Sequence, residues 1–267
     1  MANILDHIIT DKREEVKLRQ SQISLEQLRE QAVNMPKCRN FYQAVTKRNP
    51  RGINVIAEIK KASPSVGLIR KDFDPVEIAK TYERSGADAI SVLTDEKYFQ
   101  GKLEYLEQVK QAVSLPVLRK DFIIDVWQVY ESRVAGADAI LLIAEALGPG
   151  DLMDLMIAAG ELGLTVLVEV HEADTLLAVR SLIGFPKKGY SVLGINNRDL
   201  TTMKVDLGTT IRLAGLLDEG SELISESGIR TRDDVRKLKS AGVRAVLIGQ
   251  TLCEQPDIQA KFNDLFG

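Results

Sequence analysis

The segment AGADAILLIA, residues 135–144, shows the repeating unit from which this chain is built. Gly136 follows the end of a helical pattern, at a place where glycine commonly ends a helix. Asp138 then turns the chain into the apolar run AILLIA, and an uninterrupted run of this kind indicates a strand that is covered on both faces, as parallel strands are. The same passage from glycine to strand recurs as SGADAI at 85–90 and AGVRAV at 241–246.

Eight such runs follow one another, and a helical pattern lies after each of them. The runs are NVIAEIKK (54–61), AISVLT (89–94), PVLRKD (116–121), AILLIA (139–144), TVLVEV (165–170), VLGINN (192–197), ELISES (222–227) and AVLIGQ (245–250). The helical patterns lie at 75–85, 103–113, 126–135, 151–162, 172–182, 209–217, 232–240 and after residue 256. Eight units of strand and helix predict a (β/α)8 TIM barrel of the α/β class. A doubly wound open sheet competes with it, but such a sheet rarely uses eight even units and usually carries a glycine fingerprint after its first strand.

Residues 1–48 differ from the rest, because they carry helical patterns and no apolar strand. Ser24, followed three residues later by Gln27, has the composition of a capping box at the start of a helix. A further short helix is expected over 40–46. We predict a single barrel domain over residues 1–267, of which 1–48 form a helical N-terminal extension.

Composition limits the classes of function. The 267 residues are 45% hydrophobic and 27% charged, as in ordinary globular proteins. A net charge of -3, with no isolated block of Lys and Arg, argues against nucleic acid or an anionic membrane as the main partner. Cys38 and Cys253 show neither metal spacing nor a disulfide framework, and the first residues lack a signal-peptide pattern, so a cytoplasmic protein is expected.

Polar residues stand at the ends of several predicted strands. In a barrel the carboxyl ends of all strands meet at one mouth, where active sites lie. Side chains alternate along a strand, so residues two apart, such as Glu58 and Lys60, share a face. The candidates at these ends are Glu58, Lys60, Lys120, Glu169, Asn196, Arg198, Glu226 and Ser227.

The same charges have a simpler interpretation as structural ion pairs. That interpretation suits any one residue better than the set, since a buried ion pair adds little net stability and several at one end need another reason. Neither a metal nor a cofactor is predicted, because lysines interleaved with the acids would compete with a cation. His171 follows the run at 165–170 and is expected to be an exposed or capping residue rather than a base.

Two glycines indicate a phosphate site. Gly228 follows the seventh strand in ESGI (226–229), and Gly249 follows the eighth in IGQTL (248–252). Either glycine alone is explained equally well by a turn. Together they occupy the two loops in which many barrels bind phosphate, so the pair predicts a phosphorylated small-molecule ligand.

Five segments give the sequence a family resemblance: AEIKKASPS (57–65), LRKDFIID (118–125), VEVH (168–171), GINNRDL (194–200) and SESGI (225–229). They resemble the indole-3-glycerol phosphate synthase family, and the similarity begins as early as ILDHIITDKREEV. In that family a helical extension lies over the barrel mouth, so the same is expected here. The resemblance implies ring closure of 1-(2-carboxyphenylamino)-1-deoxyribulose 5-phosphate to indole-3-glycerol phosphate, with loss of carbon dioxide and water, in tryptophan biosynthesis.

The resemblance also implies catalytic roles. Lys120 is expected to be the general acid that protonates the developing oxyanion. Glu169 and Lys60 are expected to be the base and the acid of the later elimination. Glu58 and Glu226 are expected to orient the lysines and to keep them charged.

Binding roles follow from the same resemblance. Asn196 is expected to bind the substrate hydroxyl groups, and Arg198 to orient carboxylates. Phe122 and Leu200 are expected beside the aromatic ring. The residues expected to hold the phosphate are Lys60, Ser63, Ser227, Gly228, Gly249 and Gln250.

Two departures and two alternatives accompany this assignment. Gln250 stands where the family often has Ser or Glu, and Val66 stands where a Lys is often found. Another phosphate-binding barrel, such as phosphoribosylanthranilate isomerase, usually pairs a Cys with an Asp, and no Cys ends the first strand here. A non-catalytic binding barrel is expected to lack one of the central charged residues, and none is missing. Association with other tryptophan-pathway enzymes stays open.

Overall fold

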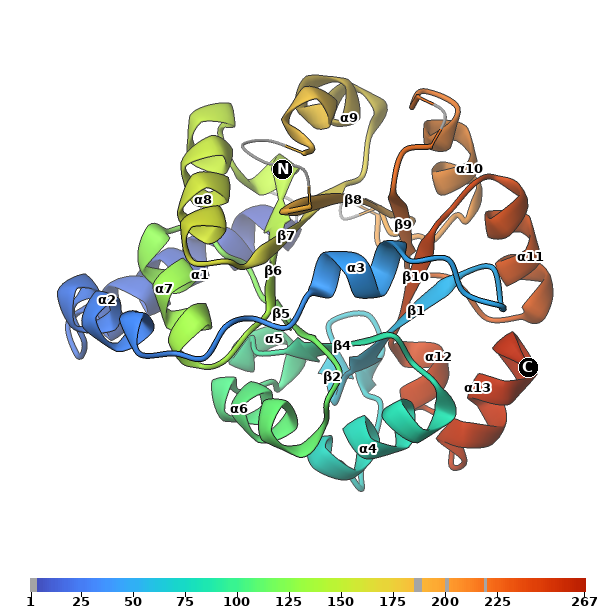
Figure 1. Ribbon diagram of the computed structural model, residues 1–267, viewed down its shortest axis with the longest axis horizontal. Coiled ribbons are helices and arrows are strands. Elements are labelled where there is room, and N and C mark those ends of the chain that lie inside the picture. The colour runs from blue at the N-terminus through green and yellow to red at the C-terminus, as the bar shows by residue number, and fades with distance from the viewer. Residues whose placement is uncertain (1–3, 185–188, 200–201, 219) are drawn as a thin grey trace.

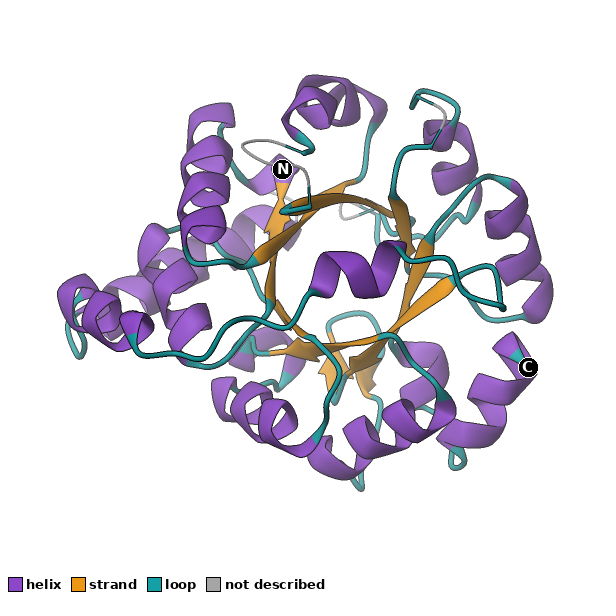
Figure 2. Ribbon diagram, viewed as in Figure 1, coloured by secondary structure: helices purple, strands orange, loops and turns teal. Residues whose placement is uncertain are grey.

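Eight parallel strands close into a barrel in the computed structural model, which describes residues 4–184, 189–199, 202–218 and 220–267 (Figure 2). The strands are β1 (Asn54–Ile59), β4 (Ala89–Leu93), β5 (Val117–Lys120), β6 (Ala139–Ile143), β7 (Thr165–Val170), β8 (Ser191–Asn196), β9 (Leu223–Glu226) and β10 (Ala245–Ile248). β1 pairs with β4 on one side and with β10 on the other, so the sheet has no edge. The predicted (β/α)8 barrel is confirmed, and the open doubly wound sheet is excluded.

Every strand except β7 ends one or two residues earlier than predicted. Glu58, Lys120 and Glu226 still belong to strands, whereas the polar residues that follow them, such as Lys60 and Ser227, lie in the loops. At β10, for example, Gly249 already stands before the first residue of the short helix α12 (Gln250–Cys253). The strand ends are therefore the places where the barrel passes into its functional loops.

Helices surround the barrel (Figure 1). They are α4 (Pro75–Ser85), α6 (Leu103–Ala112), α7 (Val126–Val134), α8 (Pro149–Glu161), α9 (Ala173–Val179), α10 (Gly208–Ala214), α11 (Arg232–Ser240) and α13 (Ile258–Phe266). The sequence did not predict the short elements in the loops, which are β2 (Ala62–Ser63), β3 (Gly67–Leu68), α5 (Glu96–Phe99), η1 (Ala144–Ala146) and α12, whereas η2 (Arg180–Leu182) falls in the helical pattern predicted over 172–182. Among the described residues, no helix is both long enough and apolar enough to span a membrane.

The repeated Gly-Ala-Asp segments have a physical role at the amino ends of the strands. Gly86 and Gly136 have φ of 92° and 87°, the left-handed conformation that ends the preceding helix. The aspartates that follow accept hydrogen bonds from neighbouring strands. Asp88 accepts from the backbone N–H of Val55 at 2.9 Å, and Asp138 accepts from that of Val117 at 2.8 Å. Each aspartate therefore satisfies a backbone donor at the start of the strand beside it.

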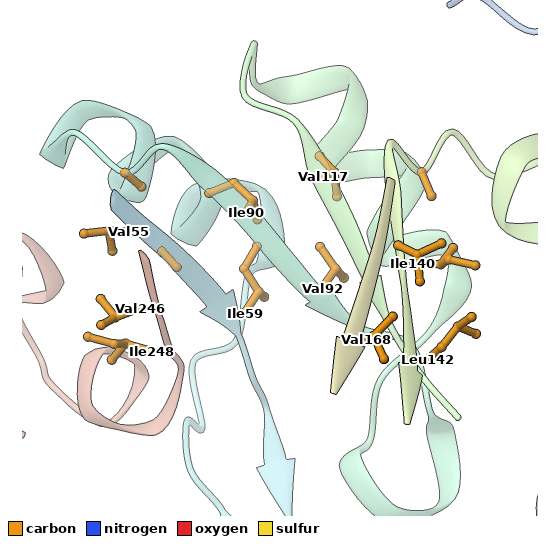
Figure 3. Packing of buried hydrophobic residues seen from close by; sticks show 14 of the residues in the cluster. Val55, Ile59, Ile90, Val92, Val117, Ile140, Leu142, Val168, Val246 and Ile248 are labelled. Carbon is orange, nitrogen blue, oxygen red and sulfur yellow. The ribbon is translucent and has the colours of Figure 1, made fainter. Parts of the chain in front are cut away.

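Two apolar layers form the core. The outer layer lies between strands and helices and includes Val55, Ile90 and Ile140, which are labelled in Figure 3. The inner layer fills the barrel and includes Ile56 and Leu118. Because side chains alternate along a strand, a residue two positions away from an inner-layer residue on the same strand also points toward the barrel axis.

The three N-terminal helices occupy different places. α1 (Ile4–Gln20) reaches the carboxyl ends of the strands, where Ile4, Leu5 and Ile8 line a cavity. α2 (Leu25–Val33), with the predicted capping box, packs outside the barrel against α7. α3 (Phe41–Thr46) crosses the opposite, amino-terminal end, as Figure 1 shows, and its Phe41 and Val45 are fully buried.

Buried charges attach α1 to the barrel. Lys12 is 1% exposed, and its Nζ lies 3.0 Å from Oδ2 of Asp95 and 3.0 Å from Oδ1 of Asp121. Asp121 also accepts a hydrogen bond from Arg119 at 3.1 Å. Asp121 directly follows Lys120 in sequence, so the ion pair that attaches α1 to the barrel lies next to a candidate catalytic residue.

Candidate active site

A cavity opens at the carboxyl ends of the strands, bounded on one side by α1. All of the predicted site residues within the described part of the chain line it. They are Glu58, Lys60, Ser63, Lys120, Phe122, Glu169, Asn196, Arg198, Glu226, Ser227, Gly228, Gly249 and Gln250. Leu200 lies outside the described residues. Candidates taken from six strands and their loops thus meet at one mouth.

Lys120 lies at the centre of the charged residues. Its Nζ is 2.7 Å from Oε2 of Glu169 and 3.1 Å from Oε2 of Glu226. Burial alone would lower the pKa of Lys120, but Glu169, Glu226 and Glu58 outweigh it, so this pKa lies above its usual value. The lysine is therefore held as an ammonium ion that carries a proton into the cavity.

A second lysine and carboxylate come from the end of β1. Nζ of Lys60 lies 3.1 Å from Oε1 of Glu58 and 5.4 Å from the centre of the Phe99 ring. Glu58 is 3% exposed, and it fits only because residue 249 is glycine. A Cβ at position 249 would stand 2.2 Å from Oε1 of Glu58. Gly249 therefore makes room for this carboxylate, whatever else it binds.

Glu169 and Glu226 have opposite electrostatic environments. Burial raises the pKa of Glu169, but Lys120 and His171 more than reverse this, and the net pKa is well below the usual value. Burial also raises the pKa of Glu226, where Lys120 opposes the shift and Glu169 adds to it, so the net pKa lies above the usual value. The two carboxylates that share Lys120 therefore differ in their pKa. Glu169 stays an anion, and Glu226 protonates more readily.

The end of β8 supplies polar groups to the same mouth. Nδ2 of Asn196 donates to Oε1 of Glu169 at 3.1 Å, and Oδ1 of Asn196 accepts from the backbone N–H of Arg198 at 3.0 Å. The guanidinium of Arg198 donates to the carbonyl of Met203 at 3.2 Å. Asn196 is therefore fixed by groups on both sides.

The loop after β9 has an unusual backbone. Ser227 and Gly228 both have positive φ, 66° and 81°, a conformation that favours glycine. Asn197 holds this loop, because its Nδ2 donates to the carbonyls of Glu226 and Ser227 at 2.9 and 3.1 Å. Asn197 is 2% exposed, and sequence reasoning gave it no role because it lies on the outward face of the barrel.

The neighbouring loops complete the rim. Oγ1 of Thr251 donates to the carbonyl of Ile229 at 2.8 Å, which joins the loops that follow β9 and β10. The side chain of Gln250 donates to Glu254 at 3.2 Å, so it is engaged within its own segment. Ser63 belongs to the β2–β3 hairpin and lies 3.4 Å, Oγ to Oγ, from Ser65.

The prediction that His171 is an exposed or capping residue was wrong, and the N-cap of α9 is Glu172. Its side chain is only 7% exposed, Nδ1 lies 3.0 Å from Oε2 of Glu145, and Nε2 lies 3.3 Å from Oε1 of Glu169. Strand alternation offered a signal, since Leu167, Glu169 and His171 are two residues apart and share a face. Glu145 gave no such signal, because it lies in η1 after another strand.

Half-buried lysines lie among carboxylates at the mouth of a closed barrel, and glycine-containing loops follow its last two strands. These features define an enzyme of the barrel class that is equipped for proton transfer. The indole-3-glycerol phosphate synthase family model matches residues 5–265. The indole-3-glycerol phosphate synthase of Geobacillus thermodenitrificans is 55% identical over 232 residues, covering 87% of this chain and 88% of that protein. The one from Rhodopirellula baltica is 47% identical over 255 residues, covering 96% and 95%. The chain belongs to the indole-3-glycerol phosphate synthase family.

A solved structure supports the fold alone. The N-acetylmannosamine-6-phosphate 2-epimerase of Clostridium perfringens superposes with a TM-score of 0.60 at 16% identity, covering 85% of this chain and 96% of that one. Family membership makes this chain a carboxy-lyase of tryptophan biosynthesis that forms indole-3-glycerol phosphate and acts on a phosphorylated small molecule.

Proposed function

We propose that this chain closes the indole ring of 1-(2-carboxyphenylamino)-1-deoxyribulose 5-phosphate with Lys120 as the general acid and Glu169 as the general base. The observation that carries the proposal is the position of Lys120, which lies 2.7 Å from Glu169 and 3.1 Å from Glu226 within the mouth cavity. This arrangement supports an acid and a base that act on neighbouring atoms of one substrate.

Ring closure requires a proton at the former ketone. The aromatic carbon that bears the carboxylate attacks the ketone carbon, and the carbonyl electrons move to its oxygen. Lys120 protonates this developing oxyanion, which is a much stronger base than an amine even when the pKa of the lysine is raised. Carbon dioxide then leaves with its bond electrons returning to the ring, which restores aromaticity.

Loss of water completes the indole. Lys60 protonates the departing hydroxyl, and the anion of Glu169 removes the proton that the new double bond releases. Glu58 orients Lys60 at 3.1 Å, and Glu226 orients Lys120 at 3.1 Å. The two lysines come from β1 and β5, so they approach the substrate from different sides of the mouth.

Binding is assigned to the rim of the cavity. Ser227, Gly228, Gly249 and the backbone of Gln250 hold the phosphate, with Lys60 and Ser63 on the side of β1. Asn196 binds the hydroxyl groups and Arg198 orients the carboxylate. Phe122, whose ring lies 6.2 Å from that of Phe99, walls the aromatic ring.

We infer that the extension and the barrel work as one domain over residues 1–267. Its support is the part of the cavity wall that Ile4, Leu5 and Ile8 supply from α1. A small phosphorylated substrate is the only partner proposed, in agreement with a net charge of -3, which favours neither nucleic acid nor an anionic membrane. A biosynthetic role supports the cytoplasm as the compartment.

The test is to mix the purified protein with the anilino-deoxyribulose phosphate and to follow the appearance of indole fluorescence. Lys120→Ala is expected to lower kcat by roughly 10²- to 10⁴-fold, the usual contribution of a positioned general acid. Lys80→Ala, on the exposed pair with Glu77 in α4, is the matched control and is expected to keep wild-type turnover. Near-normal turnover by Lys120→Ala would show that another group is the acid.

A further inference from the structure

The imidazole of His171 lies between two carboxylates at the edge of the active site. Glu145 uses both of its oxygens on this one residue: Oε1 accepts the backbone N–H of His171 at 2.7 Å, and Oε2 lies 3.0 Å from Nδ1. On the other side of the ring, Nε2 lies 3.3 Å from Oε1 of Glu169. The ring is therefore fixed in place with a carboxylate facing each nitrogen.

Only the doubly protonated ring satisfies both neighbours. A neutral imidazole has one N–H and one lone pair, so one of the two carboxylates would face a lone pair across about 3 Å. An imidazolium carries a positive charge toward both: Nδ1 hydrogen-bonds to Glu145, whereas Nε2 makes an ion pair with Glu169 at 3.3 Å without a hydrogen bond. Burial alone would lower the pKa of His171, but Glu145 and Glu169 reverse this and raise the pKa to about 10.

The contacts of Glu169 divide between its two oxygens. Asn196 and His171 lie against Oε1, at 3.1 and 3.3 Å, while Lys120 contacts Oε2 at 2.7 Å. With Oε1 occupied, the carboxylate has one orientation, and Oε2 is the oxygen that it presents to the general acid. Among the residues that line the mouth cavity, Glu169 and Asn196 appear but His171 does not, so His171 acts on the substrate only through Glu169.

We propose that His171, held as an imidazolium by Glu145, is a positioning residue that orients Glu169 and keeps it ionised as the base of the reaction. The proposal rests on the base role of Glu169 given above. Charged groups lie on both sides of the carboxylate. Without His171, Lys120 is the one cation left in contact with Glu169, and Asn196 alone holds Oε1. Glu145 in turn holds the ring through both of its oxygens.

The first experiment observes the ring in the intact protein. The chain has two histidines, His7 and His171, so His7→Gln leaves a single imidazole whose nitrogens can be followed by NMR against pH. Both nitrogens of His171 are expected to stay protonated through neutral pH, with a transition near pH 10. A neutral ring at pH 7 would overturn the proposal, and this result needs no variant at the site itself.

The second experiment separates positioning from a structural role. His171→Gln is expected to lower kcat by roughly a hundredfold with little change in KM, because misplacement of a reacting group by about 1 Å costs that much. It should also move the acid limb of the kcat/KM profile upward by about one pH unit or more, since Glu169 loses a neighbouring cation. His7→Gln, on the exposed face of α1, is the matched control. If activity falls by the same factor at every pH and the acid limb of the kcat/KM profile does not move, His171 has a structural role instead.

The third experiment tests the chain of contacts. Glu145→Gln should lower the transition of the His171 ring by about one pH unit or more. It should reduce kcat in the wild-type background and have almost no further effect on His171→Gln, because it acts through that ring. Additive losses would contradict the proposal. Glu169→Gln separates the base role of Glu169 from the positioning role of His171. If Glu169→Gln keeps its activity, the base role is wrong. If Glu169→Gln is inactive but His171→Gln is fully active, only the role of His171 is wrong.

Discussion

Gly249→Ala is expected to inactivate the enzyme through Glu58 rather than through the phosphate. The added Cβ would stand 2.2 Å from Oε1 of Glu58 and 3.0 Å from its Cδ. That same Oε1 lies 3.1 Å from Nζ of Lys60. The backbone itself accepts alanine, since φ at Gly249 is -115°. The substitution therefore acts by displacing one carboxylate from its lysine.

The size of the effect follows from the displacement. Ordinary contact begins at 3.4 Å, so the carboxylate must retreat by about 1.2 Å (3.4 minus 2.2). A misplacement of about 1 Å in a catalytic group costs roughly a hundredfold in rate, which corresponds to about 2.7 kcal/mol of transition-state stabilisation. We expect kcat to fall by that factor, with KM rising less.

Indole fluorescence under saturating substrate measures this loss, and circular dichroism checks that the fold is kept. Gly150→Ala is the matched control, because a Cβ at that position in α8 has no neighbour within 4 Å. It should leave kcat unchanged and raise the melting temperature slightly, as glycine is costly in a helix. A Gly249→Ala enzyme with kcat within about twofold of wild type would refute the reasoning.

Three further outcomes are expected. Gly228→Ala should raise KM about tenfold or more, with a smaller effect on kcat. The φ of Gly228 is 81°, and the added Cβ would stand 2.5 Å from Val205. The loop proposed to hold the phosphate would therefore have to move. Lys12→Met should lower the free energy of unfolding by about 3–5 kcal/mol, since it leaves Asp95 buried without its cation and leaves Asp121 with Arg119 alone. The pH dependence of stability should have an acid and an alkaline part. Burial alone would raise the pKa of Asp121, but Lys12 and Arg119 lower this pKa below the usual value of 3.8. The ionised Asp121 therefore stabilises the folded state above pH 3.8, and this stabilisation is lost as the pH falls toward the pKa in the folded state. The pKa of His171 is raised from 6.5 to about 10, so its contribution is complete below pH 6.5 and disappears as pH rises through 10.

Each of these outcomes has its own control. Substrate saturation curves separate KM from kcat for Gly228→Ala, and an unchanged KM would contradict a phosphate loop there. Urea titration compares Lys12→Met with Lys97→Met, which removes an exposed lysine of α5 that pairs with Asp11 of α1. The control should change stability by less than about 1 kcal/mol. Equal losses for the two lysines would refute the argument from burial. For the pH dependence, His171→Gln should flatten the alkaline part alone.

Local patterns explain why so much of the barrel was predictable. The strand starts at Ala89, Ala139 and Ala245 agree with the predicted runs, because the glycine that ends a helix and the apolar run that follows are adjacent in sequence. The period of two placed Glu58, Lys120 and other strand-end residues on the inner face correctly. Short elements such as β2, α5 and α12 escaped prediction, since four residues or fewer carry no measurable periodicity.

The sequence by itself determined the eight repeats, the face of each strand and therefore which side chains meet at the mouth, because these depend on neighbours a few residues apart. Only the tertiary structure decided which charges pair. Lys120 meets Glu169 on β7 and Glu226 on β9, neither of which is its sheet neighbour, because closure of the barrel brings side chains together across its axis. The same closure buries His171 between Glu145 and Glu169, where the low dielectric makes each contact strong. Such distances cannot be inferred from the spacing of residues along the chain.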